Sequence, residues 1–412
     1  MLTRFLLLIV SICIGFALVC SHSTAKNKTA LVTVSAGDLD RRDVVVTFLL
    51  PQDYKGSTYY LRDNRGQTTP LEIDPDRRAT FILRELKAGT IKSYSIVERK
   101  GFTDNEGAAV HLSSNDDLID VTLKGKKIFT FVGKPRGLPE PNIKEVFLRG
   151  GYIHPVFSPS GRLVTDDYPS DHYHHHGIWF AWTKTEFEGN HPDFWNVADG
   201  TGRVDSGGGQ ITRKRGDVYG SFKSEQFYVA LTGPKPRRAL TETWDVRVYN
   251  VGQESKTPYF LFDITATQVC ATTEPLKLEE YRYGGMGLRG NRDWKDKTKV
   301  SFLTSEGKTR ADGNATRGRW FVMSGPVDGA IVNIAVLDSA SNFRSPQPMR
   351  LNPDDPFFNY APSQLGPFEI KFGEPLVLRY RYVVSDGEPD PAQLNRLWND
   401  YANPPTIRID MK

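Results

Sequence analysis

Histidines are concentrated in one part of this sequence. Six of the eight histidines in the chain fall within 38 residues: His154, His172, His174, His175, His176 and His191. Because the imidazole ring titrates near neutral pH and binds metals, such a group suits proton transfer or metal ligation. A single histidine on an apolar face is more often a hydrogen-bonded core residue, and consecutive histidines also occur in solvated turns. The density of the six nevertheless predicts a functional site.

Three chemistries remain open for this site. In the first, a histidine is the general base and a carboxyl group is the acid in hydrolysis, epimerisation or β-elimination on a sugar. The candidate catalytic residues are His172, His174, His175, Asp171, Asp193 and Arg289. In the second, a divalent metal (Zn, Cu, Fe or Ca) is bound by His172, His174 and His154. In the third, the protein binds a glycan without reacting with it.

Aromatic and polar side chains near the histidines are candidates for substrate binding. They are Trp179, Trp182, Trp195, His154, Glu242 and Tyr283. Indole rings stack on sugar rings, although core packing explains any single one of them equally well. Arg289 follows the glycine-rich run 284–287 and suits a carboxylate, a sulfate or a pair of hydroxyls. The alternative is a surface arginine after a glycine turn.

The segment 167–182 must position these groups. If it is a strand, alternate side chains lie on opposite faces. One face then carries His172, His174 and His176 with Ile178, Phe180 and Trp182. The other face carries Tyr173, His175 and Trp179. Such a mixture of imidazole and aromatic rings is typical of a cleft wall.

The rest of the chain predicts an all-β protein. Short β-rich runs separated by turns continue through most of the 412 residues, and the only strong helical pattern covers 391–401, with Pro391 in its first turn. We expect a small Ig-like β-sandwich over 26–104 and a large β-sandwich over 105–412 that ends in this helix. The formal net charge is only +4, without a basic stripe, which argues against nucleic-acid binding. No glycine-rich phosphate loop is present, so the sequence requires no nucleotide cofactor.

Residues 1–25 are expected to be an export signal. Arg4 precedes an apolar stretch over 5–19, and Ser23 and Ala25 are the small residues that a cleavage site needs. The alternatives are a retained membrane anchor and lipidation at Cys20. Cleavage predicts a periplasmic or extracellular protein whose remaining cysteine, Cys270, is a buried apolar side chain.

Three motifs carry a family resemblance. The segments 171–180 (DHYHHHGIWF), 193–195 (DFW) and 283–289 (YGGMGLR) resemble the PmoA-like family of exported bacterial proteins, a domain of unknown function named after a methane oxygenase subunit. The resemblance covers residues 118–390. Tyr173 and His176 replace the family's usual proline and arginine, so no role of that arginine is carried over.

The resemblance implies a fold and a class of ligand. It implies a large sandwich similar to the galactose mutarotase-like supersandwich, which binds sugars on a concave sheet face. The expected partner is therefore a carbohydrate substrate, with a membrane involved only if the N-terminal segment is retained or lipidated. The family name itself implies no activity, because the methane oxygenase subunit is a bundle of long apolar helices and the chain beyond its N-terminal segment has none.

Overall fold

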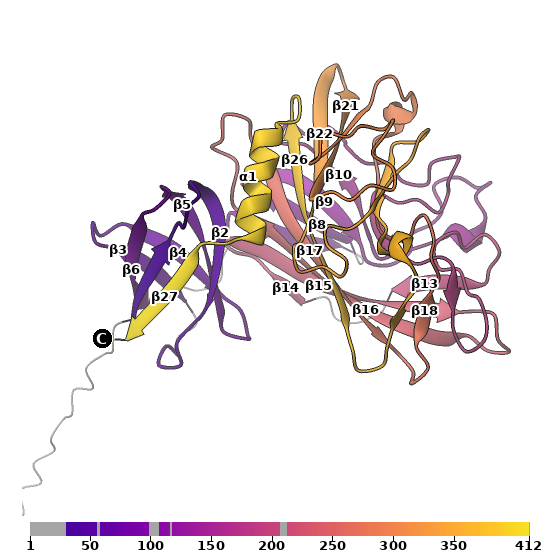
Figure 1. Cartoon of the computed structure of the whole chain (residues 1–412), viewed down its shortest axis with the longest axis horizontal. Coiled ribbons are helices and arrows are strands. Elements are labelled where there is room, and N and C mark those ends of the chain that lie inside the picture. The colour runs from indigo at the N-terminus through magenta and orange to yellow at the C-terminus, as the bar shows by residue number, and fades with distance from the viewer. Residues whose placement is uncertain (1–29, 56–57, 99–106, 116–117, 207–211, 412) are drawn as a thin grey trace, which may run out of the picture.

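The computed structural model describes residues 30–411, apart from 56–57, 99–106, 116–117 and 207–211 (Figure 1). The expected export signal, Cys20 and most of the expected domain boundary lie outside these residues. Strands account for 50% of the described residues, which contain one α-helix, α1 (Pro391–Ala402). The predicted all-β class is confirmed. Among the described residues, no helix has the length and apolar character needed to cross a bilayer.

The N-terminal residues form a seven-stranded antiparallel sheet with the order β2-β5-β4-β3-β6-β1-β27. Its strands are β1 (Ala30–Ser35), β2 (Arg41–Leu49), β3 (Tyr59–Asp63), β4 (Thr68–Ile73), β5 (Arg78–Leu86), β6 (Ile91–Glu98) and β27 (Thr406–Met411). The sheet folds over at β4, which pairs first with β3 and then with β5. Val34, Leu61 and Phe81 therefore meet in one buried core.

The last strand of this sheet comes from the other end of the chain. β27 pairs antiparallel with β1, with Ala30 opposite Met411 and Ser35 opposite Thr406. Residues 406–411, which the prediction assigned to the large domain over 105–412, thus complete the N-terminal sheet. Their alternating apolar residues, Ile407 and Ile409, pack against the N-terminal core.

Two larger sheets make up the rest of the molecule. The first has the order β23-β24-β19-β11-β10-β9-β8-β7, and the second has the order β13-β15-β16-β17-β26-β22-β21-β20, with β14 beside β15. The strands of the first are β7 (Val110–Asn115), β8 (Leu118–Leu123), β9 (Lys126–Val132), β10 (Tyr152–Val156), β11 (Ile178–Ala181), β19 (Gly285–Arg289), β23 (Met349–Leu351) and β24 (Phe357–Tyr360). Those of the second are β13 (Gly202–Ser206), β14 (Thr212–Lys214), β15 (Tyr219–Ala230), β16 (Arg237–Tyr249), β17 (Tyr259–Cys270), β20 (Ser301–Thr304), β21 (Trp320–Val327), β22 (Ala330–Asp338) and β26 (Leu376–Asp386). A small third sheet joins β12 (Thr185–Glu186), β18 (Leu276–Leu278) and β25 (Phe368–Ile370).

The two large sheets pack face to face as a sandwich. The core between them joins Phe131 and Phe180 of the first sheet to Phe262 of the second. Alternation along β11 puts Ile178 and Phe180 into this core and turns Trp179 to the outer face of the first sheet. That outer face carries the histidines. Cys270 is buried in the core, as its apolar run predicts.

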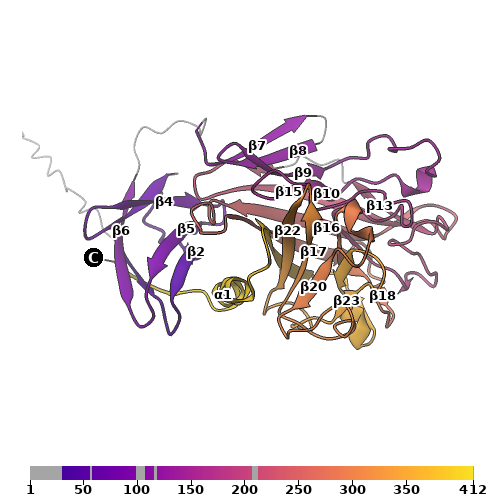
Figure 2. The ribbon, with the colours of Figure 1, turned by 90° about the horizontal axis from the view of Figure 1, so that it is seen from above.

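Helix α1 covers the outer face of the second sheet and lies at the junction with the N-terminal sheet (Figure 2). It begins as predicted, because Asp390 caps Ala392 and Gln393 while Pro391 occupies the first turn. Leu394 and Leu397 pack into an apolar cluster that includes Ile82 of β5. The helix therefore ties the two parts of the molecule together.

Candidate functional site

The histidine-rich segment is a series of turns that precedes β11. Backbone hydrogen bonds run from His172 N to Pro169 O (2.9 Å) and from His175 N to His172 O (2.8 Å). The prediction of a strand through residues 172–176 is therefore wrong, because local turn hydrogen bonds replace a sheet ladder until Ile178. As a result, neighbouring imidazoles enter different surroundings.

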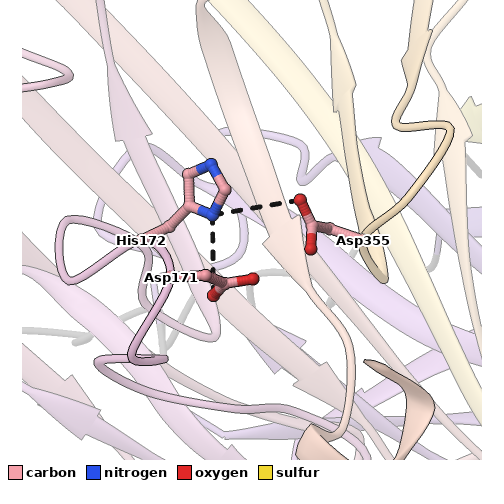
Figure 3. A group of neighbouring side chains, drawn as sticks. All are labelled: Asp171, His172 and Asp355. Atoms are coloured by element: carbon pink, nitrogen blue, oxygen red, sulfur yellow. Dashed lines mark ion pairs between the residues drawn. The ribbon is translucent and has the colours of Figure 1, made fainter. Parts of the chain in front are cut away.

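Two carboxylates, two cations and an imidazole lie together next to these turns. They are Asp171, His172, Arg289, Lys295 and Asp355, and we call this group the Asp171–Asp355 cluster. His172 Nδ1 lies 3.5 Å from Asp171 Oδ1 and 3.9 Å from Asp355 Oδ2 (Figure 3). Arg289 Nη2 donates to Asp171 Oδ1 at 3.1 Å. Lys295 Nζ donates to both carboxylates and lies 2.5 Å from Asp355 Oδ1.

Separate elements bring these five side chains together. Arg289 is the last residue of β19, and Lys295 is the last residue of the short 3-10 helix η2 (Arg292–Lys295). Asp355 lies just before β24, in a turn where the Asn352 side chain accepts from the Asp355 N–H (3.0 Å). Since β24 pairs with β19, this turn lies beside Arg289. Sequence reasoning missed Lys295 and Asp355, because strand order alone brings them to Asp171.

The charges in this cluster balance one another. Burial opposes ionisation of Asp171, but the hydrogen bond from Lys295 and the nearby Arg289 outweigh it and hold the pKa of this carboxyl below its ordinary value. The same pairing raises the pKa of Lys295, again against the effect of burial. Asp171 is therefore ionised at neutral pH and is unsuited to act as a proton donor.

His175 packs against two members of the cluster, His172 and Arg289. It is buried, stacks on His172 with ring centroids 4.6 Å apart, and lies with Nδ1 3.3 Å from Arg289 Nη1. It also contacts the rings of Trp179 and Phe357. Burial, with the nearby charges, lowers the pKa of His175 well below the ordinary histidine value, so the ring is neutral. His175 thus positions Arg289 and His172.

His174 and His176 lie outside the cluster. Burial lowers the pKa of His174 to about 3, and its ring packs against Phe147 of η1 (Glu145–Phe147). His176 Nδ1 lies 2.7 Å from Asp167 Oδ1, and its ring stacks on Tyr152. The exposed His191 lies 3.7 Å from Glu279.

The predicted metal group of His172, His174 and His154 is not assembled. His154 is on β10, where Nδ1 lies 3.0 Å from Thr165 Oγ1. Within the described part of the chain, the ligand atoms of Asp171, His172 and Asp355 do lie within 4.8 Å of one another. Only His172 belongs to both groups.

The predicted aromatic platforms are buried. Trp182 is 0% exposed and donates from Nε1 to Gln268 Oε1 (2.7 Å) inside the sandwich. Trp179 and Trp195 are 0% and 2% exposed and pack beneath His175. The assignment of these three residues as sugar platforms is wrong, because Trp182 packs between the two sheets and the His175 ring lies against Trp179 and Trp195.

Three further predicted residues support other parts of the fold. Glu242 is 0% exposed within the sandwich core, where Gln268 Nε2 donates to it (2.8 Å), and burial raises its pKa to about 7. Asp193 accepts from the backbone N–H groups of Trp195 (2.8 Å) and Asn196 (2.9 Å), so it fixes its own turn. Tyr283 donates to Asn196 Oδ1 (3.0 Å). The sealed position of Glu242 contradicts its assignment to substrate binding.

A family model for a family of unknown function, DUF6807, matches residues 118–399. The chain belongs to the DUF6807 family. This bears out the coarser part of the resemblance, a domain of unknown function over nearly the same span. No curated protein matches the chain. The DUF6807 match includes all five residues of the Asp171–Asp355 cluster; it begins after β6 and ends before β27, so it leaves out every strand of the N-terminal sheet.

Proposed function

We propose that this DUF6807 protein is an exported enzyme that acts on a carbohydrate, with His172 as its proton-transfer group. The observation that supports this most is the placement of His172, which is partly exposed and turns Nδ1 toward two carboxylates (Figure 3). Carboxylates on one ring nitrogen fix the tautomer and leave the other nitrogen, Nε2, to exchange a proton with a substrate. The Nδ1 distances are longer than hydrogen bonds, and Nδ1 has no hydrogen-bond partner within the described residues. A small movement on ligand binding would complete the contact.

Within carbohydrate chemistry, the cluster favours proton abstraction over hydrolysis. Glycoside hydrolysis generally needs one carboxyl group that holds a proton and a second one about 5–9.5 Å away. Here Asp171 and Asp355 share Lys295 as a donor, and Asp171 is held ionised. A base beside Arg289 and Lys295 suits removal of a proton next to a carboxylate or carbonyl, because the cations stabilise the negative charge that develops on oxygen. The reaction class is therefore a lyase or an epimerase.

His172→Gln tests this proposal. We expect turnover to fall by about 100-fold or more, which is typical of loss of a general base. The assay is ultraviolet absorbance of unsaturated products and NMR of epimers, over plant and algal oligosaccharides that contain uronic acids. His191→Gln is the matched control, because His191 is exposed and lies outside the cluster. Full turnover by the His172 variant would refute the proposal, and glycan binding without any turnover would instead favour a binding protein.

A divalent-metal enzyme is the second candidate, supported by the closeness of Asp171, His172 and Asp355. Two carboxylate oxygens and an imidazole nitrogen are suitable metal ligands. However, Lys295 hydrogen-bonds to both carboxylates and would have to leave. If a metal binds here, Lys295→Met removes a competing cation, so bound Zn, Cu, Fe or Ca in the purified protein should increase. Elemental analysis of the Lys295→Met and Asp355→Asn variants measures the bound metal. Activity that persists in a chelator would instead favour the metal-free reaction.

Export and a mutarotase-like architecture belong to the same proposal. The apolar stretch over 5–19 supports export, and two stacked antiparallel sheets with polar groups on an outer face support the likeness to mutarotase-like sandwiches. Intact mass of protein recovered from the periplasm or medium should correspond to a chain that begins after Ala25. A mass that includes the N-terminal segment would favour the anchor.

A further inference from the structure

A pocket of about 380 Å³ lies beside the histidine-rich turns and is not used by the chemistry proposed above. Its lining includes Val132, Arg136, Pro139, Tyr152, His154 and Asp167, and we call it the His154 pocket. β10 supplies Tyr152 and His154, and the segment after β9 supplies Arg136 and Pro139. The volume is in the range of small-molecule sites.

The polar groups of the pocket have fixed orientations. Thr165 Oγ1 accepts from the backbone N–H of Val156 (3.0 Å) and lies 3.0 Å from His154 Nδ1. A Thr165 hydroxyl that accepts this N–H still has a proton to donate and a second lone pair, so it pairs with either tautomer of His154; when it donates to Nδ1, the ring proton is on Nε2. Burial lowers the pKa of His154, although Asp167 and Asp166 oppose the shift, so the ring is neutral. His154 then offers a neutral N–H donor.

Asp167 supplies a fixed acceptor in the lining of the pocket. Its Oδ1 lies 2.7 Å from His176 Nδ1, and its Oδ2 accepts from the Tyr152 hydroxyl at 2.9 Å. Each carboxylate oxygen keeps a second lone pair, and the side chain is 18% exposed. The partners of Asp167 are themselves buried, so the carboxylate is held in place before any ligand arrives.

The backbone at the pocket wall is strained. Tyr168, which also lines the pocket, has φ +47°, a left-handed conformation that residues other than glycine seldom adopt. It is held there because Tyr168 N donates to His175 O (3.1 Å) and its hydroxyl accepts from Arg149 N (3.3 Å). Such strain is concentrated at functional sites.

The pocket presents hydrogen-bond donors and acceptors in fixed positions among tyrosine rings and prolines. This arrangement suits a sugar ring that carries several hydroxyl groups. The pocket is also close to the Asp171–Asp355 cluster, because the turns that begin at Asp167 continue to Asp171 and His172. On the sheet, β10 and β19 are separated only by β11, which is a spacing of about 10 Å. We infer that the His154 pocket is a subsite for the sugar residue next to the one that reacts. This inference rests on the proposed function for its class of ligand.

The test compares His154→Ala with His172→Gln in the full chain. A glycan array of plant, algal and animal saccharides first selects the best ligand, and calorimetry then measures binding of that ligand and its shortened forms. We expect His154→Ala to bind the longer forms about tenfold more weakly, since a buried hydrogen-bond donor is lost, and the monosaccharide that reacts at His172 with unchanged affinity. His172→Gln should lose turnover but keep the wild-type preference for the longer forms over the monosaccharide. The matched control is His191→Ala, and thermal unfolding checks that each variant folds.

A second variant acts at the mouth of the pocket without disturbing its interior. Arg136 is exposed, so Arg136→Ala should fold normally and should weaken binding of uronic or sulfated saccharides more than that of neutral ones. The subsite would be overturned if both variants bound the saccharides as tightly as the wild type does. It would also be overturned if no glycan on the array bound to the protein.

The two proposals fail in different ways. Binding that requires His154, without turnover of any saccharide, keeps the subsite and rejects the enzyme. Turnover that requires His172, with unchanged chain-length preference in His154→Ala, keeps the enzyme and rejects the subsite.

Discussion

Burial decides what each histidine of the run is able to do. His172 is partly exposed and faces carboxylates, whereas His175 is sealed between rings and is neutral. His176, two residues from His174, is held by Asp167. Histidines at neighbouring positions therefore differ in role, because the turns point one ring toward carboxylates near the surface and others into buried positions. Residue type singled out the segment that carries the candidate site, but it did not distinguish the imidazole beside Asp171 and Asp355 from the one beside Asp167.

Glu242 makes the stability of the protein depend on pH. Its carboxyl has an ordinary pKa of 4.5 when unfolded, and burial raises this value to about 7 in the folded chain. The folded state thus holds the proton more tightly, so the free energy of unfolding falls as pH rises from about 4.5 to about 7 and is then level. The expected contribution of this group is about 3 kcal/mol.

Glu242→Gln removes this titration. We expect the free energy of unfolding of the variant, measured by denaturant titration across this pH range, to decline less than that of the wild type. Parallel pH profiles for the two proteins would show that the Glu242 proton is not the cause. Glu374→Gln, an exposed substitution, is the control.

At the scale of elements, close contact between neighbouring strands shapes the outer face of the first sheet. Trp179 of β11 is paired with Gly287 of β19, and its ring lies flat over that glycine. A Cβ on Gly287 would lie 2.9 Å from the Trp179 ring, which is too close. The absence of a side chain at Gly287 therefore leaves room for the ring that supports His175.

Gly287→Ala should displace Trp179 and destabilise the protein by about 1–3 kcal/mol, as overpacking does. Chemical unfolding followed by tryptophan fluorescence measures both effects. Gly107→Ala is the control, because a Cβ at that position would have no described atom within 4 Å. Equal stability of the two variants would mean that the ring adjusts without cost.

The elements were predictable to different degrees. Alternation predicted that Ile178 and Phe180 lie on one face of β11 and Trp179 on the other, although it did not predict that the first face is buried, and the proline start predicted α1. The same alternation extended the strand too far, because the pattern of residues 172–176 does not reveal that turn hydrogen bonds satisfy the backbone there. Lys295 and Asp355 were beyond reach for another reason. The pairing of β19 with β11 brings Lys295, in η2 just after β19, toward Asp171, and the pairing of β24 with β19 adds Asp355. Local periodicity does not encode this strand order.

At the scale of the whole molecule, a buried ion pair connects the N-terminal sheet to α1. Arg41 of β2 donates to Asp400 Oδ1 (2.9 Å) and to the carbonyl oxygens of Ala36 and Asn403. Arg41 and Asp400 are both about 4% exposed. Arg396 also contacts Asp400, at 3.3 Å, so the carboxylate keeps one cation if Arg41 is lost.

Arg41→Ala should lower the free energy of unfolding by about 3 kcal/mol, because it leaves a buried carboxylate with too few partners. Arg41→Ala combined with Asp400→Ala should cost less than the two single changes together, which denaturant unfolding of all four proteins would measure. Arg78→Ala breaks an exposed ion pair with Asp76 and should change stability little. Strict additivity of the Arg41 and Asp400 effects would exclude the coupling.

The pairing of β27 with β1 has a consequence for how the protein is made. During synthesis, residues 30–98 emerge long before residues 406–411, so one side of β1 keeps its backbone amides and carbonyls unpaired until residues 406–411 arrive. A part of the polypeptide that is made early is therefore among the last to reach its finished form, and during that interval it offers an open template to any other extended segment nearby.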